Sequence, residues 1–409
     1  MEGKLHIRLD RHILLIGLVI TFIFTAIPLQ IVQAEGQSAV PTTHAQAYSV
    51  IDVTSGRILT EYQGDKKMKI ASLTKVMTAI VAIEQGELSD LVTVSPNAYG
   101  KEGSSIYLQL GEEMSLHSML YGLMLRSGND AATAIAEHVG GSVEGFVYMM
   151  NEKAQWLGLE QTLFQNPHGL DDEQHYSSAN DLARLTAYAL HNAIFREIVA
   201  TKHKQVPNPN KPWDYRWINK NKMLSLYEGA DGVKTGYTKQ AHRTLISSAT
   251  RGGQQVAVVT LDDGDDWHDH RKLLDYAFAN YPLTPIVENQ ERVHQPNLAV
   301  GTAFAYPLGK DELGSLRKKI VLEPEGTTNY QLGSRGTLKI FLQGQQIASL
   351  PLFEEGHPRL KLTEKHAWNT IRDNREEPAR LFEFFHQLWR NLFANPTGEA
   401  QKREGEIAW

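Results

Sequence analysis

The sequence predicts an α/β (α+β) fold: helices packed on one sheet, then a small all-β domain, then a terminal amphipathic helix. Three observations lead to this prediction. Strand-like runs stand on both sides of a helical block between residues 45 and 283. Short apolar runs separated by Gly, Pro and polar residues fill residues 290–362. Bulky apolar and polar side chains recur at helical spacing in residues 376–394.

The composition of the chain excludes several classes of protein. Its 409 residues are 42% hydrophobic and 22% charged, which is ordinary for a globular chain. The formal net charge is -6 with both signs interspersed, whereas a nucleic-acid binder should carry a basic bias. Because there is no cysteine, disulfides, Cys-ligated zinc sites and thiol chemistry are excluded.

The region 45–283 is expected to open with a strand and to continue with helices. AYSVIDV has the residue types of a strand, and the TSGR behind it is turn-like. A helix is expected from Ser72 to about Gln85, ended by Gly86. Further helices are expected at residues 115–126, 131–139, 145–157 and 179–191, with a break at SGND after the first of them.

The pattern becomes β from Gly232 onward. GVKTGYT, RTLISSATR and QQVAVVTLD are strand-length runs, and Gly252-Gly253 joins the last two. Residues 271–280 are expected to form a closing helix. After it, four short runs predict the strands of the small β domain: AVGTAFAY, KKIVLEP, TLKIFLQG and QQIASLPLF.

The N-terminus has the pattern of an export signal. A basic segment with Lys4, Arg8 and Arg11 precedes the apolar run ILLIGLVITFIF. Val-Gln-Ala then offers a small-residue cleavage site ending at Ala34, so residues 1–34 are predicted to be a signal peptide. The alternative is an uncleaved anchor, but the apolar run is shorter than the ~20 residues that span a bilayer.

The C-terminal segment 378–393, PARLFEFFHQLWRNLF, predicts an amphipathic helix within residues 376–394. At about 100° per residue its leucines and aromatic residues fall on one half of the helix and its charged and amide residues on the other. The alternative is a helix that packs on its own domain. The aromatic-rich face at the end of the chain favours a helix lying on a membrane surface. With the signal, it predicts an exported protein held peripherally on the extracytoplasmic face of the cell membrane.

The candidate chemistry begins with ASLTKVMTA, residues 71–79. On a helix Ser72 and Lys75, three residues apart, share a face. The positive end of the helix disfavours a lysine cation, and a neutral lysine can take the hydroxyl proton and make serine nucleophilic. Alone the pair is weak evidence, because an ordinary helix start has the same spacing.

Two further motifs strengthen this interpretation. Ser127-Gly128-Asn129, at the break between two helices, offers a hydroxyl and a carboxamide from a tight turn. Lys234-Thr235-Gly236 lies in a strand, where the lysine could simply face solvent. The glycine weakens a strand but lets the backbone of a ligand approach closely.

In this order the three motifs resemble those of the serine penicillin-recognising enzymes. The Ser-Gly-Asn form resembles the low-molecular-weight penicillin-binding proteins of the D-alanyl-D-alanine carboxypeptidase family. Most of residues 45–283 shares the resemblance, including IDVTSGRIL, FQNPHGLDDEQHYSSANDLARL and DGVKTGYT. It implies a β-lactamase/transpeptidase-like catalytic domain with an antiparallel sheet and helices. It also implies peptidoglycan stem peptides ending in D-Ala-D-Ala as substrates, covalent reaction with β-lactams, and no cofactor or metal.

The resemblance also implies a role for each motif residue. Ser72 would attack the carbonyl between the two terminal D-alanines, Lys75 would act as general base, and Ser127 would relay a proton to the leaving amine. Asn129 would hydrogen-bond the backbone of the substrate, and Lys234 and Thr235 would bind its terminal carboxylate. Gly236 and Tyr237 would lie beside the substrate on the same strand. The backbone N–H groups of Ser72 and Tyr237 would form the oxyanion hole.

Two segments need separate interpretation, because one departs from the family pattern and the other is rich in possible metal ligands. His242 stands where the family usually has glycine, which puts the turn there in doubt because histidine tolerates a positive φ less well. LDDGDDWHDHR, residues 261–271, is rich in metal-ligating side chains. Neighbours in a loop seldom converge on one ion, so it is interpreted as a solvated turn with Asp269 near a helix start.

Two other functions are weighed against a carboxypeptidase. A β-lactamase on the same fold would need a deacylating glutamate, and no E-x-x-L-N precedes Asn166, since Glu160 has the wrong spacing. A non-catalytic sensor of wall precursors or antibiotic is disfavoured by the intact motif set.

Overall fold

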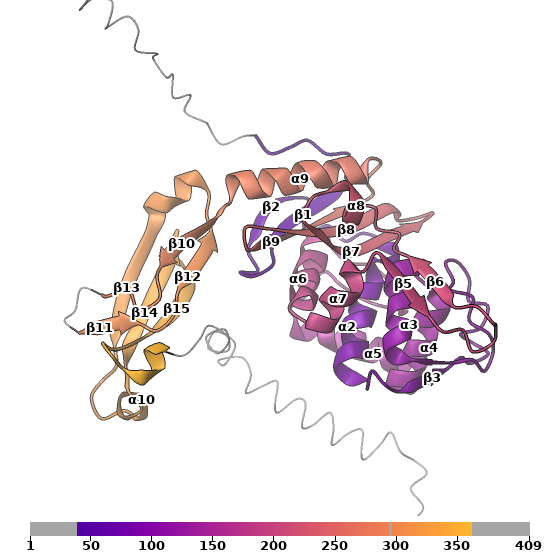
Figure 1. Cartoon of the computed structure of the whole chain (residues 1–409). Coiled ribbons are helices and arrows are strands. Elements are labelled where there is room, and N and C mark those ends of the chain that lie inside the picture. Colours follow the sequence, from indigo (N-terminus) through magenta and orange to yellow (C-terminus); the bar gives the residue numbers. More distant parts are fainter. Residues whose placement is uncertain (1–38, 294–296, 362–409) are drawn as a thin grey trace, which may run out of the picture. The chain divides into compact units, whose positions relative to one another are not determined.

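The computed structural model describes residues 39–293 and 297–361 (Figure 1). The predicted signal peptide, residues 1–34, and the predicted amphipathic helix, residues 376–394, therefore lie outside the described residues. Within the described ranges, no helix has both the length and the apolar character needed to cross a membrane.

A five-stranded antiparallel sheet forms the centre of the region that contains the three motifs (Figure 1). Its order is β2-β1-β9-β8-β7, so the first strand of the region pairs with the last one. The single sheet and the antiparallel arrangement were both expected. The bounds of the strands are β1 Ala47–Asp52, β2 Ile58–Tyr62, β7 Ala230–Thr238, β8 His242–Arg251 and β9 Gln254–Leu261.

Helices bury both faces of this sheet. On β9, Val256 and Val258 belong to one apolar cluster, which includes Leu273 of the closing helix. Ala257 and Val259 belong to the larger cluster on the opposite face. A strand buried on both faces has a nearly continuous apolar sequence, which explains QQVAVVTL. The helices are α2 Lys75–Gln85, α3 Leu116–Tyr121, α4 Asn129–Gly140, α5 Val143–Trp156, α6 Ala179–Leu190, α7 Ala193–Ala200, α8 Met223–Leu226 and α9 Asp266–Asn280.

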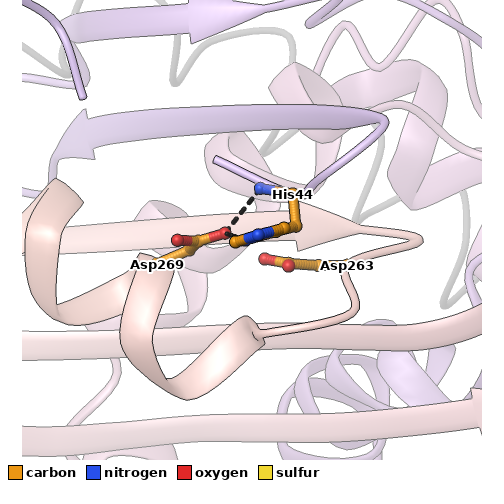
Figure 2. Close-up of side chains that lie close together, drawn as sticks. All are labelled: His44, Asp263 and Asp269. Carbon is orange, nitrogen blue, oxygen red and sulfur yellow. Dashed lines mark hydrogen bonds and ion pairs between the residues drawn. The ribbon is translucent and has the colours of Figure 1, made fainter. Parts of the chain in front are cut away.

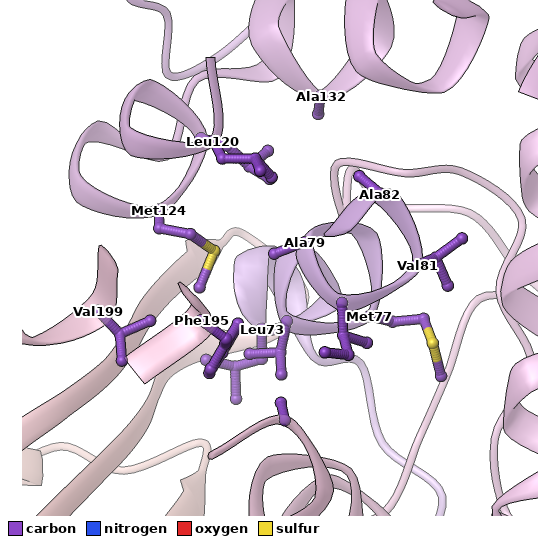
Figure 3. Packing of buried hydrophobic residues seen from close by; sticks show 14 of the residues in the cluster. Leu73, Met77, Ala79, Val81, Ala82, Leu120, Met124, Ala132, Phe195 and Val199 are labelled. Atoms are coloured by element: carbon purple, nitrogen blue, oxygen red, sulfur yellow. The ribbon is translucent and has the colours of Figure 1, made fainter. Parts of the chain in front are cut away.

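Helix α2 runs through the larger cluster and is buried along its first eight residues. A helix that is apolar on nearly all sides belongs in the interior of a domain, which fits the sequence KVMTAIVA. Figure 3 shows Met77, Ala79 and Ala82 among side chains of other helices, such as Leu120 and Phe195. This packing fixes the start of α2, and with it the Ser72–Lys75 pair.

Several predicted elements differ from the observed ones. The helix expected from Ser72 begins as a 3₁₀ turn, Ala71–Thr74, and the helix expected at 115–126 ends in a π-helical turn, Gly122–Arg126. The closing helix starts five residues earlier than expected. The hairpin of β5 (His203–Val206) and β6 (Tyr215–Ile218) was not predicted, because its short strands are polar and lack a clear alternation.

The prediction for segment 261–271 is wrong in part. The segment is not a solvated turn throughout, although Asp269 does lie in the first turn of a helix, α9, as expected. Asp263, Asp269 and His270 are almost fully buried. The ring of His270 lies within hydrogen-bond distance of Thr260 Oγ1, at 3.0 Å, and of the hydroxyl of Ser247. The segment was misjudged because charge in a sequence suggests exposure, whereas buried polar groups that find partners are tolerated.

The turn at His242 is retained in spite of the histidine. His242 has a φ of 54°, in the left-handed region that glycine would occupy. Its ring Nδ1 lies 2.8 Å from Asp262 Oδ1. The side-chain contact holds the residue in this conformation, and β7 and β8 keep their pairing up to Thr238 and His242.

The chain after α9 forms two further sheets and a short helix, α10 Thr328–Gln331. A four-stranded antiparallel sheet has the order β11-β15-β14-β13, and β10 pairs with β12. The run AVGTAFAY is not one strand, because β11 and β12 belong to different sheets on either side of Gly301-Thr302-Ala303. The bounds are β10 Leu283–Val287, β11 Leu298–Val300, β12 Phe304–Pro307, β13 Leu316–Leu322, β14 Ser334–Leu342 and β15 Gln345–Glu354.

Candidate active site

The structure places Ser72 and Lys75 side by side at the start of α2. Ser72 lies in the 3₁₀ turn and Lys75 is the first residue of the helix, with its Nζ 3.1 Å from Ser72 Oγ. Ala71, just before the serine, has a φ of 48°. An alanine in this left-handed conformation is uncommon, and such residues cluster at functional sites.

Lys75 is buried and its amine contacts three oxygen atoms. Its Nζ donates to Asn129 Oδ1 at 2.7 Å and to the backbone oxygen of His168 at 2.5 Å. Burial, and then the positive charges of Lys234 and Lys220, lower the pKa of Lys75 well below its ordinary value. A neutral amine has two N–H groups and one lone pair. In the neutral form the two carbonyl oxygens accept both N–H groups, and the lone pair is then directed to the Ser72 hydroxyl.

The Ser-Gly-Asn motif meets this pair from the break before α4. Ser127 has a left-handed backbone, with φ 63° and ψ 38°, and is 4% exposed. Its Oγ has no hydrogen-bond partner among the described residues. Asn129 Nδ2 donates to the backbone oxygen of Glu102 at 2.6 Å, which fixes the carboxamide so that its oxygen faces Lys75.

The Lys-Thr-Gly motif runs along β7, at the edge of the sheet. Lys234 is 1% exposed, and its Nζ donates to the backbone oxygen of Thr235 at 2.7 Å. Burial, and then the charge of Lys220, lower its pKa to about 7. A Cβ on Gly236 would lie 3.0 Å from Ser72 N, so this strand passes directly beside the serine. Tyr237 is 66% exposed and lies at the rim.

The site also contains a residue that sequence reasoning missed. Lys220 Nζ lies 3.1 Å from Ser104 Oγ, and its charge lowers the pKa of both Lys75 and Lys234. It comes from an irregular loop after β6 and belongs to none of the three motifs, so its spacing gave no signal. Three lysines therefore lie near one another around a serine, an arrangement suited to binding an anion.

This site can be compared with known proteins. Residues 33–265 match the sequence profile of D-alanyl-D-alanine carboxypeptidases. The chain belongs to the D-alanyl-D-alanine carboxypeptidase family. D-alanyl-D-alanine carboxypeptidase DacF of Bacillus subtilis is 31% identical over 360 residues, covering 83% of this chain and 92% of DacF. DacC of Escherichia coli is 34% identical over 346 residues, covering 78% and 85%.

Solved structures agree with this assignment. Penicillin binding protein 5 from Haemophilus influenzae superposes with a TM-score of 0.63 at 30% identity, covering 77% of this chain and 97% of that chain. The resemblance drawn from the three motifs is confirmed, as are the α/β transpeptidase-like fold and the serine-type carboxypeptidase activity. The β-lactamase and the non-catalytic sensor were the weaker interpretations.

In this carboxypeptidase a second segment packs against the turn that carries the serine. Gly169 has a φ of 83°, and a Cβ there would lie 1.9 Å from the backbone oxygen of Ala71. His175 Nε2 lies 2.8 Å from Thr74 Oγ1, which donates to the backbone oxygen of Ala71 at 2.9 Å. The stretch NPHGLDDEQHY therefore packs against the turn that carries Ser72.

A buried aspartate orders the loop in front of the site. Asp130 accepts hydrogen bonds from the backbone N–H groups of Ile106 and Leu108, at 3.1 and 3.2 Å, and from Ser105 Oγ at 2.6 Å. It follows Asn129 directly, so one turn of α4 positions both the carboxamide and this loop. Sequence reasoning assigned Asp130 no role, because its partners are backbone groups that no motif reveals.

Replacing Gly236 with alanine should lower the rate of acylation by penicillin about 10²-fold, as expected for a misplacement of about 1 Å. The new Cβ would lie 2.5 Å from Thr244 Oγ1 and 3.0 Å from Ser72 N, so the strand or the serine must shift. Gly264→Ala is the matched control, because nothing lies within 4 Å of a Cβ there. Equal acylation rates in the two variants would contradict the close approach of β7 to the serine.

Proposed function

We propose that Ser72 is the nucleophile of this carboxypeptidase and attacks the carbonyl carbon of the penultimate D-alanine of a peptidoglycan stem peptide. The observation that carries the proposal is the buried amine of Lys75, whose Nζ lies 3.1 Å from Ser72 Oγ and also contacts Asn129 Oδ1 and the backbone oxygen of His168. The Ser72 proton passes to Nζ as the new C–O bond forms. The backbone N–H groups of Ser72 and Tyr237 donate hydrogen bonds to the oxyanion and form the oxyanion hole.

The tetrahedral intermediate then collapses with loss of the terminal D-alanine. Ser127 donates its hydroxyl proton to the leaving nitrogen and recovers a proton from Lys75, which restores the neutral amine. The unpartnered Oγ of Ser127 supports this role, because a buried hydroxyl without a partner is available to a ligand. Water hydrolyses the resulting ester, again with Lys75 as base. A β-lactam presents an amide carbonyl and a carboxylate, so penicillin acylates Ser72 in the same way.

The terminal carboxylate of the substrate is held on β7. Lys234 and the Thr235 hydroxyl bind it, Gly236 lets it approach the strand, and Asn129 bonds the backbone of the peptide. Lys220 adds positive charge near both lysines of the motifs, which supports the choice of an anionic substrate terminus. No step of this mechanism requires a metal or an organic cofactor.

Lys234→Ala should lower kcat/KM for peptides ending in a carboxylate by roughly 10- to 150-fold. A charge-assisted hydrogen bond contributes about 1.5 to 3 kcal/mol, which corresponds to that factor. The same peptides with an amidated terminus lack the charged partner and should lose much less. Equal losses for the two substrates in a D-alanine release assay would show that Lys234 does not hold the carboxylate.

The pH profile gives an independent test of the same residue. Lys234 has a pKa of about 7 in the free enzyme, so its charged form declines as the pH rises above that value. Because only the charged form attracts a carboxylate, kcat/KM for carboxylate substrates should fall on the alkaline side. The amidated peptides should show no such decline.

The domain arrangement and the location extend this proposal. Residues 1–34 act as a signal peptide, residues 45–283 form the catalytic domain, and residues 290–362 form a small β-rich domain. Residues 376–394 form an amphipathic helix that holds the exported enzyme on the extracytoplasmic face of the membrane. An aromatic-rich apolar face opposite a polar one supports the last assignment.

Truncation after Asp373 should move the mature enzyme from the membrane to the soluble fraction without affecting hydrolysis of a soluble peptide. The helix places eight large apolar side chains on one face, and full burial of one is worth about 1.5 to 3 kcal/mol. Liposome co-sedimentation of the mature full-length and truncated proteins measures the difference. If both remain in the supernatant, the helix packs on a protein surface instead.

A further inference from the structure

Three side chains from separate parts of the chain meet at one end of the central sheet: His44, Asp263 and Asp269. The pairing of Ala47 with Leu261 brings the residues before β1 next to those after β9. Helix α9 then begins at Asp266 and adds Asp269. One possible ligand atom from each side chain lies within 4.8 Å of the other two. Figure 2 shows the two carboxylates close to the imidazole ring.

Asp263 is the least satisfied member of this cluster. The residue is 1% exposed, and Oδ1 accepts the backbone N–H of Asp265 at 3.0 Å. Its other oxygen, Oδ2, has no hydrogen-bond partner among the described residues. A buried polar group without a partner is costly, and a buried charge more so. In Figure 2 this carboxylate points toward His44, so it faces the other side chains of the cluster.

Lys272 and the ring of His44 face Asp269, whereas no described cation pairs with Asp263. Asp269 is fully buried, its Oδ1 accepts from Lys272 Nζ at 2.9 Å, and its Oδ2 accepts the backbone N–H of His44 at 2.6 Å. The nearby Arg243 is engaged by Asp266, with Nε at 3.1 Å. No ion pair of Asp263 is found within the described residues. One further positive charge between Asp263 and Asp269 would complete the arrangement.

We propose that His44, Asp263 and Asp269 bind one zinc ion, through Nδ1 of the histidine and one oxygen of each aspartate. Zinc takes His nitrogen and carboxylate oxygen ligands at about 2.0 to 2.2 Å, so neighbouring ligand atoms lie roughly 3.3 to 3.5 Å apart. His44 Nδ1 and Asp269 Oδ2 are already 3.0 Å apart. The His44 side chain is 62% exposed and free to adjust. Solvent can supply the fourth ligand.

The choice of zinc follows from the ligand set. One imidazole and two carboxylates suit a tetrahedral zinc site. Calcium takes about six to eight oxygen ligands and magnesium keeps several waters, so neither matches a site with a histidine nitrogen. The role we assign is structural. The ion would tie the segment before β1 to α9 and to the end of β9, and it takes no part in the chemistry at Ser72.

Calorimetric titration of the purified, untagged protein with Zn²⁺, after removal of metal with EDTA, tests the proposal. We expect one zinc per chain and a higher unfolding temperature when zinc is present, because a ligand that binds only the folded state stabilises it. Asp263→Asn and His44→Ala should each weaken binding at least about tenfold. Asp262→Asn is the matched control, because Asp262 is adjacent in sequence and bonds His242 instead.

Two results of the titration would contradict the proposal. If wild type binds no zinc, or if wild type and Asp263→Asn bind it equally well, the proposal is wrong. His44→Ala removes an exposed side chain and keeps the test valid should the Asp263 variant fold poorly. Acylation by penicillin reports folding of each variant, since none of the three residues belongs to the proposed catalytic machinery.

Discussion

Replacing Lys75 with alanine should lower the rate of Ser72 acylation by penicillin by about 10² to 10⁴-fold, the usual contribution of a general base. The amine of Lys75 lies 3.1 Å from Ser72 Oγ, and its burial lowers its pKa well below the ordinary value. Without it, the hydroxyl loses the base proposed to take its proton. Stopped-flow acylation with a fluorescent penicillin measures the rate, and circular dichroism checks the fold.

Lys75→Met is the matched control for packing. Methionine fills most of the buried volume, so it separates loss of the base from creation of a cavity. Both variants leave Asn129 Oδ1 and the His168 oxygen without their donor, and both should acylate equally slowly. Near-normal acylation in either variant would remove Lys75 as the base.

The free energy of unfolding should fall steeply as the pH falls from about 6.5 toward 4, because buried histidines, among them His168 and His175, stay neutral in the folded protein. Burial is the main cause that lowers the pKa of His168 to about 3 and that of His175 to about 4. The unfolded chain takes up both protons near pH 6.5, the ordinary value. Since the unfolded state then binds more protons, acid favours unfolding, by up to about 1.4 kcal/mol per pH unit for each histidine.

Hydrogen bonds explain why His175 resists protonation. Its Nδ1 accepts the backbone N–H of Gln165 at 3.1 Å, and its Nε2 donates to Thr74 Oγ1, which in turn donates to Ala71. A proton on Nδ1 would face the Gln165 N–H group. Protonation therefore breaks a chain of bonds that ends at the turn carrying Ser72.

Denaturant titrations at several pH values test this account. His175→Asn should reduce the pH dependence by roughly one proton, whereas substitution of the exposed His203 should leave it unchanged. An unchanged slope in the His175 variant would show that other groups control acid stability.

The sequence predicted those parts of the site that are set by local spacing. Ser72 and Lys75 are three apart, so any helical turn brings them together, and the motif order indicated that Ser127, Asn129 and Lys234 would join them. The start and end of the sheet were predicted for a similar reason, since apolar runs buried on both faces are recognisable.

What the sequence did not reveal depends on contacts between distant residues. Lys220 and His168 affect Lys75 through charge and a backbone oxygen, and neither belongs to a motif. The acidic segment 261–271 was judged from its own residues alone. Its partner His44 lies 225 positions before Asp269, and only the pairing of β1 with β9 brings it there.

Mass spectrometry of the protein after reaction with benzylpenicillin tests the central claim most directly. We expect one covalent adduct per chain, located on the peptide that contains Ser72, and none in Ser72→Ala. The same Ser72→Ala variant should release no D-alanine from a peptide ending in D-Ala-D-Ala. An adduct on any other residue, or an adduct that persists in Ser72→Ala, would contradict the assignment of Ser72 as the nucleophile.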